Sequence, residues 1–162
     1  MTKVMKIKAE LAERTAAGRG VVFFGPCGTG KDHLAIALMY QAAWKHGIAC
    51  RWALGIKMYS MIADSWKNSS KRPQVISPFL SPQILCISDA LTPGKETLEP
   101  FKIDAMYEII GERNARQLPT WATLNVAHEQ EASDRLSQPV WDRLRDGCAV
   151  LECSWDSFRK PE

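Results

Sequence analysis

One stretch decides the fold of this chain: Val21-Val22-Phe23-Phe24-Gly25-Pro26-Cys27-Gly28-Thr29-Gly30-Lys31-Asp32. Four apolar residues run into a glycine-rich loop and a helical pattern follows over residues 31–44, so the loop joins a strand to a helix. In such a loop, backbone N–H groups surround an anion, the helix N-terminus adds a positive dipole end, and Lys31 reaches the terminal phosphates. A turn that merely reverses the chain needs neither this lysine nor this setting. The sequence therefore predicts a nucleoside triphosphate site.

The composition indicates one globular domain, because 162 residues with 46% hydrophobic and 24% charged content suffice for a single core. No apolar run approaches the ~20 residues that cross a bilayer, and no signal-type apolar segment follows the N-terminus, so we expect a cytoplasmic protein without a membrane partner. Five cysteines, with no CxxC pair, support neither a disulfide framework nor a zinc site. The net charge of +3 permits a nucleic-acid partner without indicating one.

Strand and helix patterns alternate along the chain. Apolar runs predict strands at residues 21–24, 49–54, 84–87, 120–124 and 149–153. Periodic apolar residues predict helices at 6–17, 31–44, 56–66, around 103–110 and across 127–145, with loops at 68–73 and 92–99. The pattern predicts a three-layer α/β sandwich with a five-stranded parallel sheet. Residues 84–87, a continuous apolar run, are expected at its centre.

Five segments in this order resemble a known family: Gly25-Pro26-x-Gly28-Thr29-Gly30-Lys31-x-His33-Leu34-Ala35, Ser88-Asp89, Asn125, Trp141-Asp142-Arg143-Leu144 and Ser154-Trp155-Asp156-Ser157-Phe158-Arg159. They resemble the AAA+ ATPases of the DnaC helicase-loader and IstB transposition-helper type, over residues 18–160. The resemblance implies a P-loop NTPase of the AAA+/ASCE type at residues 19–162, preceded by a short N-terminal helix within 1–18. Loaders of this type carry an N-terminal partner-binding region, and only residues 1–18 precede Arg19 here. The sequence is therefore either a stand-alone core or a fragment of a longer chain, and the usual docking to a helicase stays open.

The resemblance also implies a function. It is that of an ATP-binding, weakly hydrolysing switch that uses Mg²⁺, self-associates and acts on DNA as a helicase loader or transposition helper. A replicative helicase or a transposase would be its protein partner. The ATP-binding residues would be Gly25, Pro26, Cys27, Gly28, Thr29, Gly30, Lys31, Asp32 and His33. Two other functions stay open, a nucleotide-binding interaction module that does not hydrolyse ATP and a small-molecule phosphotransferase, although the chain shows no arginine-rich lid for the latter.

Three polar residues receive catalytic roles from the resemblance. Asn125 would be the sensor that holds the attacking water or the γ-phosphate, and Arg159 a second sensor acting within its own chain. Arg143 would be an arginine finger offered to a neighbouring subunit, which accelerates hydrolysis by about 10³ or more. Each has an ordinary alternative, since Asn125 can cap the helix after it, Arg143 can pair with Asp142 or Asp146, and Arg159 can be a tail residue.

The metal site departs from the family pattern at two positions. Phosphate-loop ATPases hold Mg²⁺ with a hydroxyl at the position of Asp32 and a carboxylate at the position of Ser88, beside an acid that orients water. In this sequence the carboxylate is at position 32 and the hydroxyl at position 88, the reverse of the family pattern. This arrangement predicts a direct hydrogen bond between Asp32 and Ser88. It leaves Asp89, one methylene shorter than the usual Glu, to orient the water. In the rival register Asp89 holds the metal, Ala90 replaces the catalytic acid, and hydrolysis is nearly lost. Drift in a degenerate ATPase is a third interpretation.

Basic and aromatic residues follow the second predicted strand: Lys57, Tyr59, Trp66, Lys67, Lys71 and Arg72. Helicase loaders and initiators carry an extra helical element here that touches single-stranded DNA, and interleaved cations and aromatics suit phosphate tracking and base stacking. The alternative places Trp66 in the core at helical spacing from Tyr59 and Ile62, and leaves residues 67–72 as a solvated loop.

Overall fold

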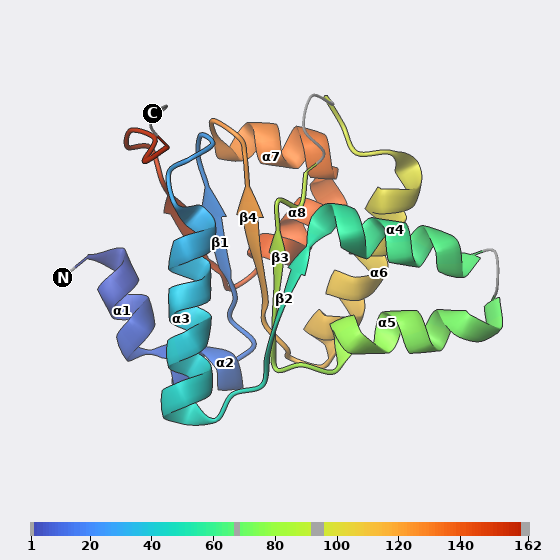
Figure 1. The fold of residues 1–162 in the computed structure, drawn as a ribbon, viewed down its shortest axis with the longest axis horizontal. Helices are drawn as coiled ribbons and strands as arrows, with labels where there is room; N and C mark the ends of the chain where they lie inside the picture. Colours follow the sequence, from blue (N-terminus) through green and yellow to red (C-terminus); the bar gives the residue numbers. More distant parts are fainter. Residues whose placement is uncertain (1, 67–68, 92–95, 160–162) are drawn as a thin grey trace.

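Five parallel strands form one sheet in the part of the chain that this computed structural model describes, residues 2–66, 69–91 and 96–159 (Figure 1). The strands are β1 (Val21–Phe24), β2 (Cys50–Leu54), β3 (Ile84–Ser88), β4 (Thr120–Leu124) and β5 (Ala149–Glu152). Their order across the sheet is β2-β3-β4-β1-β5, and each neighbouring pair is parallel. The predicted five-stranded parallel sheet is confirmed.

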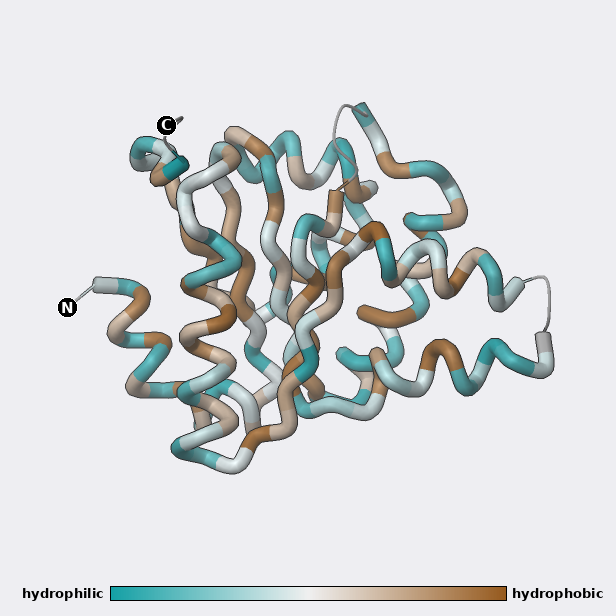
Figure 2. Tube along the Cα trace, viewed as in Figure 1, coloured by the Kyte–Doolittle hydropathy of each residue, from teal (hydrophilic) through white to brown (hydrophobic). Residues whose placement is uncertain are grey.

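Helices cover both faces of the sheet, as the three-layer prediction requires. On one face lie α1 (Lys3–Ala9), α2 (Leu11–Ala16) and α3 (Lys31–His46). On the other lie α4 (Gly55–Trp66), α5 (Arg72–Leu80), α6 (Pro100–Ala115), α7 (Glu129–Leu136) and α8 (Gln138–Arg145), with the 3₁₀ helix η1 (Ser69–Lys71) before α5. Successive residues of β1 enter the two cores alternately, and Figure 2 shows hydrophobic stretches along the strands. No helix among the described residues is long and apolar enough to cross a membrane.

The position of β3 differs from the prediction. β4 is the central strand, and β3 lies between it and β2. Every residue of β3 and of β4 is buried. Any interior strand of a parallel sheet is covered on both faces, so a continuous apolar run indicates an interior strand without indicating the middle one.

Two local predictions were also wrong. The single helix expected over residues 6–17 is two short helices, α1 and α2, which meet at Glu10. The loop expected over residues 68–73 is helical from Ser69 onward, although Asn68 itself lies outside the described residues. Pro73 suggested a loop, but it occupies the first turn of α5, where a missing N–H costs no helical hydrogen bond.

Arg113 joins several segments near the start of the central strands. Its side chain is fully buried and its five N–H donors reach five acceptors, namely the carbonyls of Phe79, Pro82, Gln83 and Pro119 and the hydroxyl of Thr120. Burial lowers the pKa of Arg113 to about 10. The guanidinium therefore links α6 to the chain leaving α5 and to the segments that enter β3 and β4.

We predict that Arg113→Ala will lower the free energy of unfolding by about 3 kcal/mol or more, because it leaves buried carbonyls without their charged donor. Arg116→Ala is the matched control on the adjacent turn, where the exposed pair with Glu112 should contribute less than about 0.5 kcal/mol. Urea unfolding of both variants provides the measurement. Equal midpoints for the two variants would show that Arg113 does not hold these segments together.

Candidate functional site

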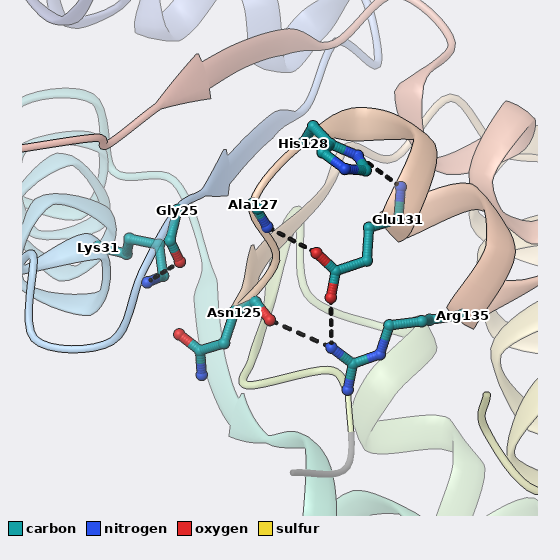
Figure 3. A network of polar contacts seen from close by, with 7 residues as sticks. All are labelled: Gly25, Lys31, Asn125, Ala127, His128, Glu131 and Arg135. Carbon is teal, nitrogen blue, oxygen red and sulfur yellow. Dashed lines mark hydrogen bonds and ion pairs between the residues drawn. The ribbon is translucent and has the colours of Figure 1, made fainter. Parts of the chain in front are cut away.

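The glycine-rich loop lies between β1 and α3, at the edge where the parallel strands end (Figure 1). Lys31 is the first residue of α3 and is buried. Its Nζ donates to the carbonyl of Gly25 at 2.8 Å and to that of Pro26 at 2.6 Å, and Figure 3 shows it folded back toward Gly25. Burial lowers the pKa of Lys31. The loop thus encloses a cation that has lost much of its hydration.

A cavity of about 770 Å³ opens beside this loop, within the size range typical of small-molecule sites. It is lined by the loop and the start of α3, by Asp89 and Asn125 at the ends of β3 and β4, and by residues of the C-terminal segment. All the residues predicted to bind the nucleotide line it except Gly25 and Pro26, which instead accept hydrogen bonds from Lys31.

One carboxylate and two hydroxyls lie together at the edge where the parallel strands end. Asp32 Oδ1 accepts hydrogen bonds from Ser88 Oγ at 2.9 Å and from Thr123 Oγ1 at 2.8 Å. The predicted hydrogen bond between Asp32 and Ser88 is therefore present. Thr123 was missed, although its position two residues before Asn125 in the fourth predicted strand places it on the same side of the sheet edge.

Asp89 connects this cluster to Asn125. Its backbone lies in the left-handed region with φ 46°, its N–H donates to Thr123 Oγ1 at 2.9 Å, and its Oδ1 accepts from Asn125 Nδ2 at 2.7 Å. The side chain of Asp89 lines the cavity, whereas Ala90 is fully buried in the apolar core. Because the backbone of Asp89 is left-handed, Asp89 faces the cavity while Ala90 faces the core.

Asn125 does not cap the helix that follows it. The N-cap of α7 is His128, whose Nδ1 accepts from the backbone N–H of Glu131 at 3.1 Å (Figure 3). Glu131 also accepts from Ala127 N–H, which lowers the pKa of Glu131, and binds Arg135, which donates to the carbonyl of Asn125. This network fixes the backbone of Asn125 while its amide points toward the cavity.

The segment after β5 contacts the phosphate loop directly. Trp155 Nε1 donates to the carbonyl of Thr29 at 2.9 Å, and the backbone N–H of Phe158 donates to that of Gly28 at 3.0 Å. Within this segment the sequence analysis assigned a role only to Arg159, and Arg159 does line the cavity. The contacts of Trp155 and Phe158 were missed because they are made to backbone atoms, which carry no side-chain signal.

Arg143 lies elsewhere, in a shallow hollow lined by residues 142, 143 and 145–147, and does not line the cavity. Its guanidinium stacks on the ring of Tyr107 at 3.7 Å from the centroid, and its Nη2 donates to the Tyr107 hydroxyl at 2.6 Å. The alternative pairing of Arg143 with Asp142 is not seen among the described residues, where Asp142 pairs with Arg145 at 3.2 Å.

The residues considered for DNA binding differ in how far they are buried. Tyr59 is buried and donates to the carbonyl of Ala90, so it belongs to the core. Trp66 is 43% exposed, with its ring edge-to-face against Phe101, and Arg72 lies over the same ring while pairing with Glu108. Lys57 and Lys71 are exposed, and Lys67 lies outside the described residues.

Comparisons with known proteins agree with this architecture. A family model described as "IstB-like ATP binding protein" matches residues 6–162. The fold resembles that of the DnaC helicase loader, with a TM-score of 0.81 and 20% identity over 91% of this chain and 86% of that chain. It also resembles DnaI (TM-score 0.71, 19% identity, 94% and 86%) and replication initiator DnaA bound to AMPPCP and single-stranded DNA (TM-score 0.74, 16% identity, 93% and 45%). No curated protein matches the chain in sequence.

We predict that Gly28→Ala will weaken ATP binding by about tenfold or more. A Cβ at this position, where φ is 84°, would lie 2.0 Å from Ser157 Oγ and 3.0 Å from Ser157 Cβ, so Ser157 or the loop must shift. Gly47→Ala is the matched control, because Gly47 has a similar φ of 65° but nothing within 4 Å of the added Cβ. Gly47→Ala should lose about 1 kcal/mol of stability and keep its ATP affinity. Calorimetric ATP titrations with equal affinity for both variants would contradict the prediction.

Proposed function

The chain belongs to the IstB-like ATP-binding protein family, and on this premise we propose that it is a weakly hydrolysing ATP switch that assembles with copies of itself on DNA. One observation carries the proposal: the Asp32 carboxylate is hydrogen-bonded to Ser88 directly beside the phosphate-loop Lys31. Within this proposal the protein serves as a helicase loader or as a transposition helper.

ATP would bind with its phosphates in the loop of residues 25–31. Lys31 would exchange its two carbonyl acceptors for β- and γ-phosphate oxygens, and the N-terminus of α3 would add its dipole to the same anion. The depressed pKa of Lys31 supports this role, since a poorly hydrated ammonium gains more from an incoming phosphate than a solvated one does. His33 and the C-terminal segment line the remainder of the cavity.

The donor set at the sheet edge fits Mg²⁺, which prefers one or two carboxylates together with substrate phosphates. Asp32 would supply the carboxylate and Ser88 the hydroxyl, and bound Mg²⁺ would neutralise the phosphate charge. Among the described residues no three His, Cys, Asp or Glu side chains group closely enough to hold a metal by themselves. Without bound Mg²⁺, Asp32 would repel the β- and γ-phosphates.

Hydrolysis would depend on Asp89 and Asn125. Asp89 would orient the attacking water, and Asn125 holds its carboxylate at 2.7 Å. The burial of Ala90 supports this register, because a side chain at that position does not reach the cavity. An aspartate is one methylene shorter than the usual glutamate, so the rate should be low. Arg159 would contact the phosphates from the same chain, and Arg143 those of a neighbouring copy.

DNA would contact the helical element formed by α4, η1 and α5. Lys57 and Lys71 are exposed there, and Trp66 is 43% exposed beside Arg72. Cations around an accessible aromatic ring suit single-stranded DNA. Lys67, also proposed for this surface, belongs to the same segment in sequence.

The first test is ATP turnover as a function of protein concentration. Turnover per chain should rise with concentration, because Arg143 acts between copies, and single-stranded DNA should raise it further.

Lys31→Ala should lose ATP affinity by roughly 10- to 100-fold, whereas Lys45→Ala, at the exposed end of the same helix, should not. Lys57→Glu/Lys71→Glu should remove the response to DNA, with Lys8→Glu/Lys45→Glu as the control on the other face.

Two results would contradict this proposal. ATP affinity that survives Lys31→Ala in a natively folded protein would remove the phosphate-loop site. Turnover that is absent at every concentration, with ATP binding intact, would instead assign the chain to the non-hydrolysing interaction modules.

The exchange of Asp32 and Ser88 makes a separate prediction. Asp32→Thr should lower Mg²⁺-dependent turnover by about tenfold, because no carboxylate remains at the metal, and Ser88→Asp should lower it similarly by crowding two acids. The double variant rebuilds the common hydroxyl–carboxylate arrangement and should recover or exceed the starting rate. Losses that add strictly in the double variant, with thermal unfolding confirming a folded protein, would mean that the two positions do not share a metal.

A further inference from the structure

One face of α6 surrounds Arg143 of the neighbouring helix α8. Three residues spaced four and three apart, Tyr107, Gly111 and Asn114, lie on this face, and each meets a different part of Arg143. Nothing in the family pattern or in the comparisons assigns a role to these three residues.

Tyr107 contacts the guanidinium twice. The ring lies 3.7 Å from the central guanidinium carbon and the hydroxyl accepts from Nη2 at 2.6 Å, so both the plane and the rotation of the guanidinium are restrained. Among the described residues this is the only hydrogen bond that the guanidinium makes to the protein. Its other N–H donors are left for an acceptor that comes from outside.

Gly111 and Asn114 complete the arrangement. A Cβ on Gly111 would lie 3.1 Å from Arg143 Nη1, so glycine at this point of the helix allows the guanidinium to approach α6 closely. Asn114 Nδ2 donates to the backbone carbonyl of Arg143 at 3.0 Å and thereby fixes the start of the side chain. A glycine in a helix interior is unfavourable, and the approach of Arg143 gives it a purpose.

Packing between the two helices does not need this pair. Ile110 of α6 and Leu144 of α8 are fully buried in the core, whereas Tyr107 is 43% exposed. The stack therefore orders a charged group at the surface, outside the buried core that the two helices share. The restrained group is the one that resemblance assigns to catalysis between copies.

We propose that Tyr107, with Gly111 and Asn114, is a positioning site that holds Arg143 extended toward the terminal phosphate of ATP bound by a second copy. This inference rests on the proposed function. A free arginine side chain must lose many rotamers when it reaches a phosphate, and a guanidinium that is already oriented loses fewer. The opposite role, in which Tyr107 sequesters Arg143, predicts the opposite sign when the ring is removed.

A mixture of two inactive chains tests the proposal. Arg143→Ala chains bind ATP but offer no finger, and Lys31→Ala chains offer a finger but bind ATP far more weakly. At an ATP concentration that fills only the Arg143→Ala chains, turnover in the mixture therefore comes from hybrid interfaces. Tyr107→Ala placed in the Lys31→Ala chain should reduce this turnover by about tenfold, and Tyr107→Phe, which keeps the ring, by less. Tyr107→Ala in the Arg143→Ala chain, whose finger is already absent, should have no further effect.

Tyr40→Ala in the Lys31→Ala chain is the matched control, because Tyr40 is an exposed tyrosine on α3, far from this surface in sequence and on the other face of the sheet. A general structural defect would lower turnover from either chain, whereas positioning depends on which chain carries the change. Equal effects in the two chains, no effect, or an increase would overturn the inference while leaving the function in place. No turnover in the parent mixture, with active wild-type protein, would overturn both the inference and the role of Arg143 between copies.

Discussion

The carboxylate of Asp32 links the phosphate loop to the strands of the sheet. It accepts from Ser88 at the end of β3 and from Thr123 in β4, and Asp32 itself is the second residue of α3, directly after Lys31. A parallel sheet brings the ends of these strands to one edge, so residues 32, 88 and 123 meet although they are far apart in the chain. The same edge receives Asp89 and Asn125. Hydrogen bonds through Thr123 and Asp89 therefore connect this carboxylate to Asn125.

The two functional surfaces of the chain are separate. The nucleotide cavity opens between the loop and the C-terminal segment, while Arg143 lies in its own hollow on the side of the sheet that α6 and α8 cover. Arg143 does not line the cavity, which supports the proposal that it acts on a neighbouring copy and that turnover depends on self-association. The C-terminal segment donates to two loop carbonyls and is thereby joined to the loop.

Sequence patterns predicted what depends on periodicity and on local motifs: the five strands, the strand–loop–helix setting of Lys31, and the bond between Asp32 and Ser88. They could not predict what depends on long-range backbone acceptors. Arg113 looks like an ordinary helical arginine until one carbonyl at the end of α5 and three loop carbonyls surround it. Tyr107 fits the periodicity of a buried face, yet the position of α8 leaves it at the surface beside Arg143. The order of the interior strands is likewise set by packing rather than by composition.

The central claim is that Asp32 and Ser88 together hold the cation of bound ATP. Its most direct test is anomalous diffraction from crystals grown with Mn²⁺ and an ATP analogue that is not hydrolysed, because manganese can replace magnesium at oxygen ligands and gives a distinct signal. We expect one manganese peak between the phosphates and the sheet edge, about 2.1 Å from an oxygen of Asp32 and from Ser88 Oγ. A peak coordinated by Asp89, with Asp32 turned away from it, would contradict the account.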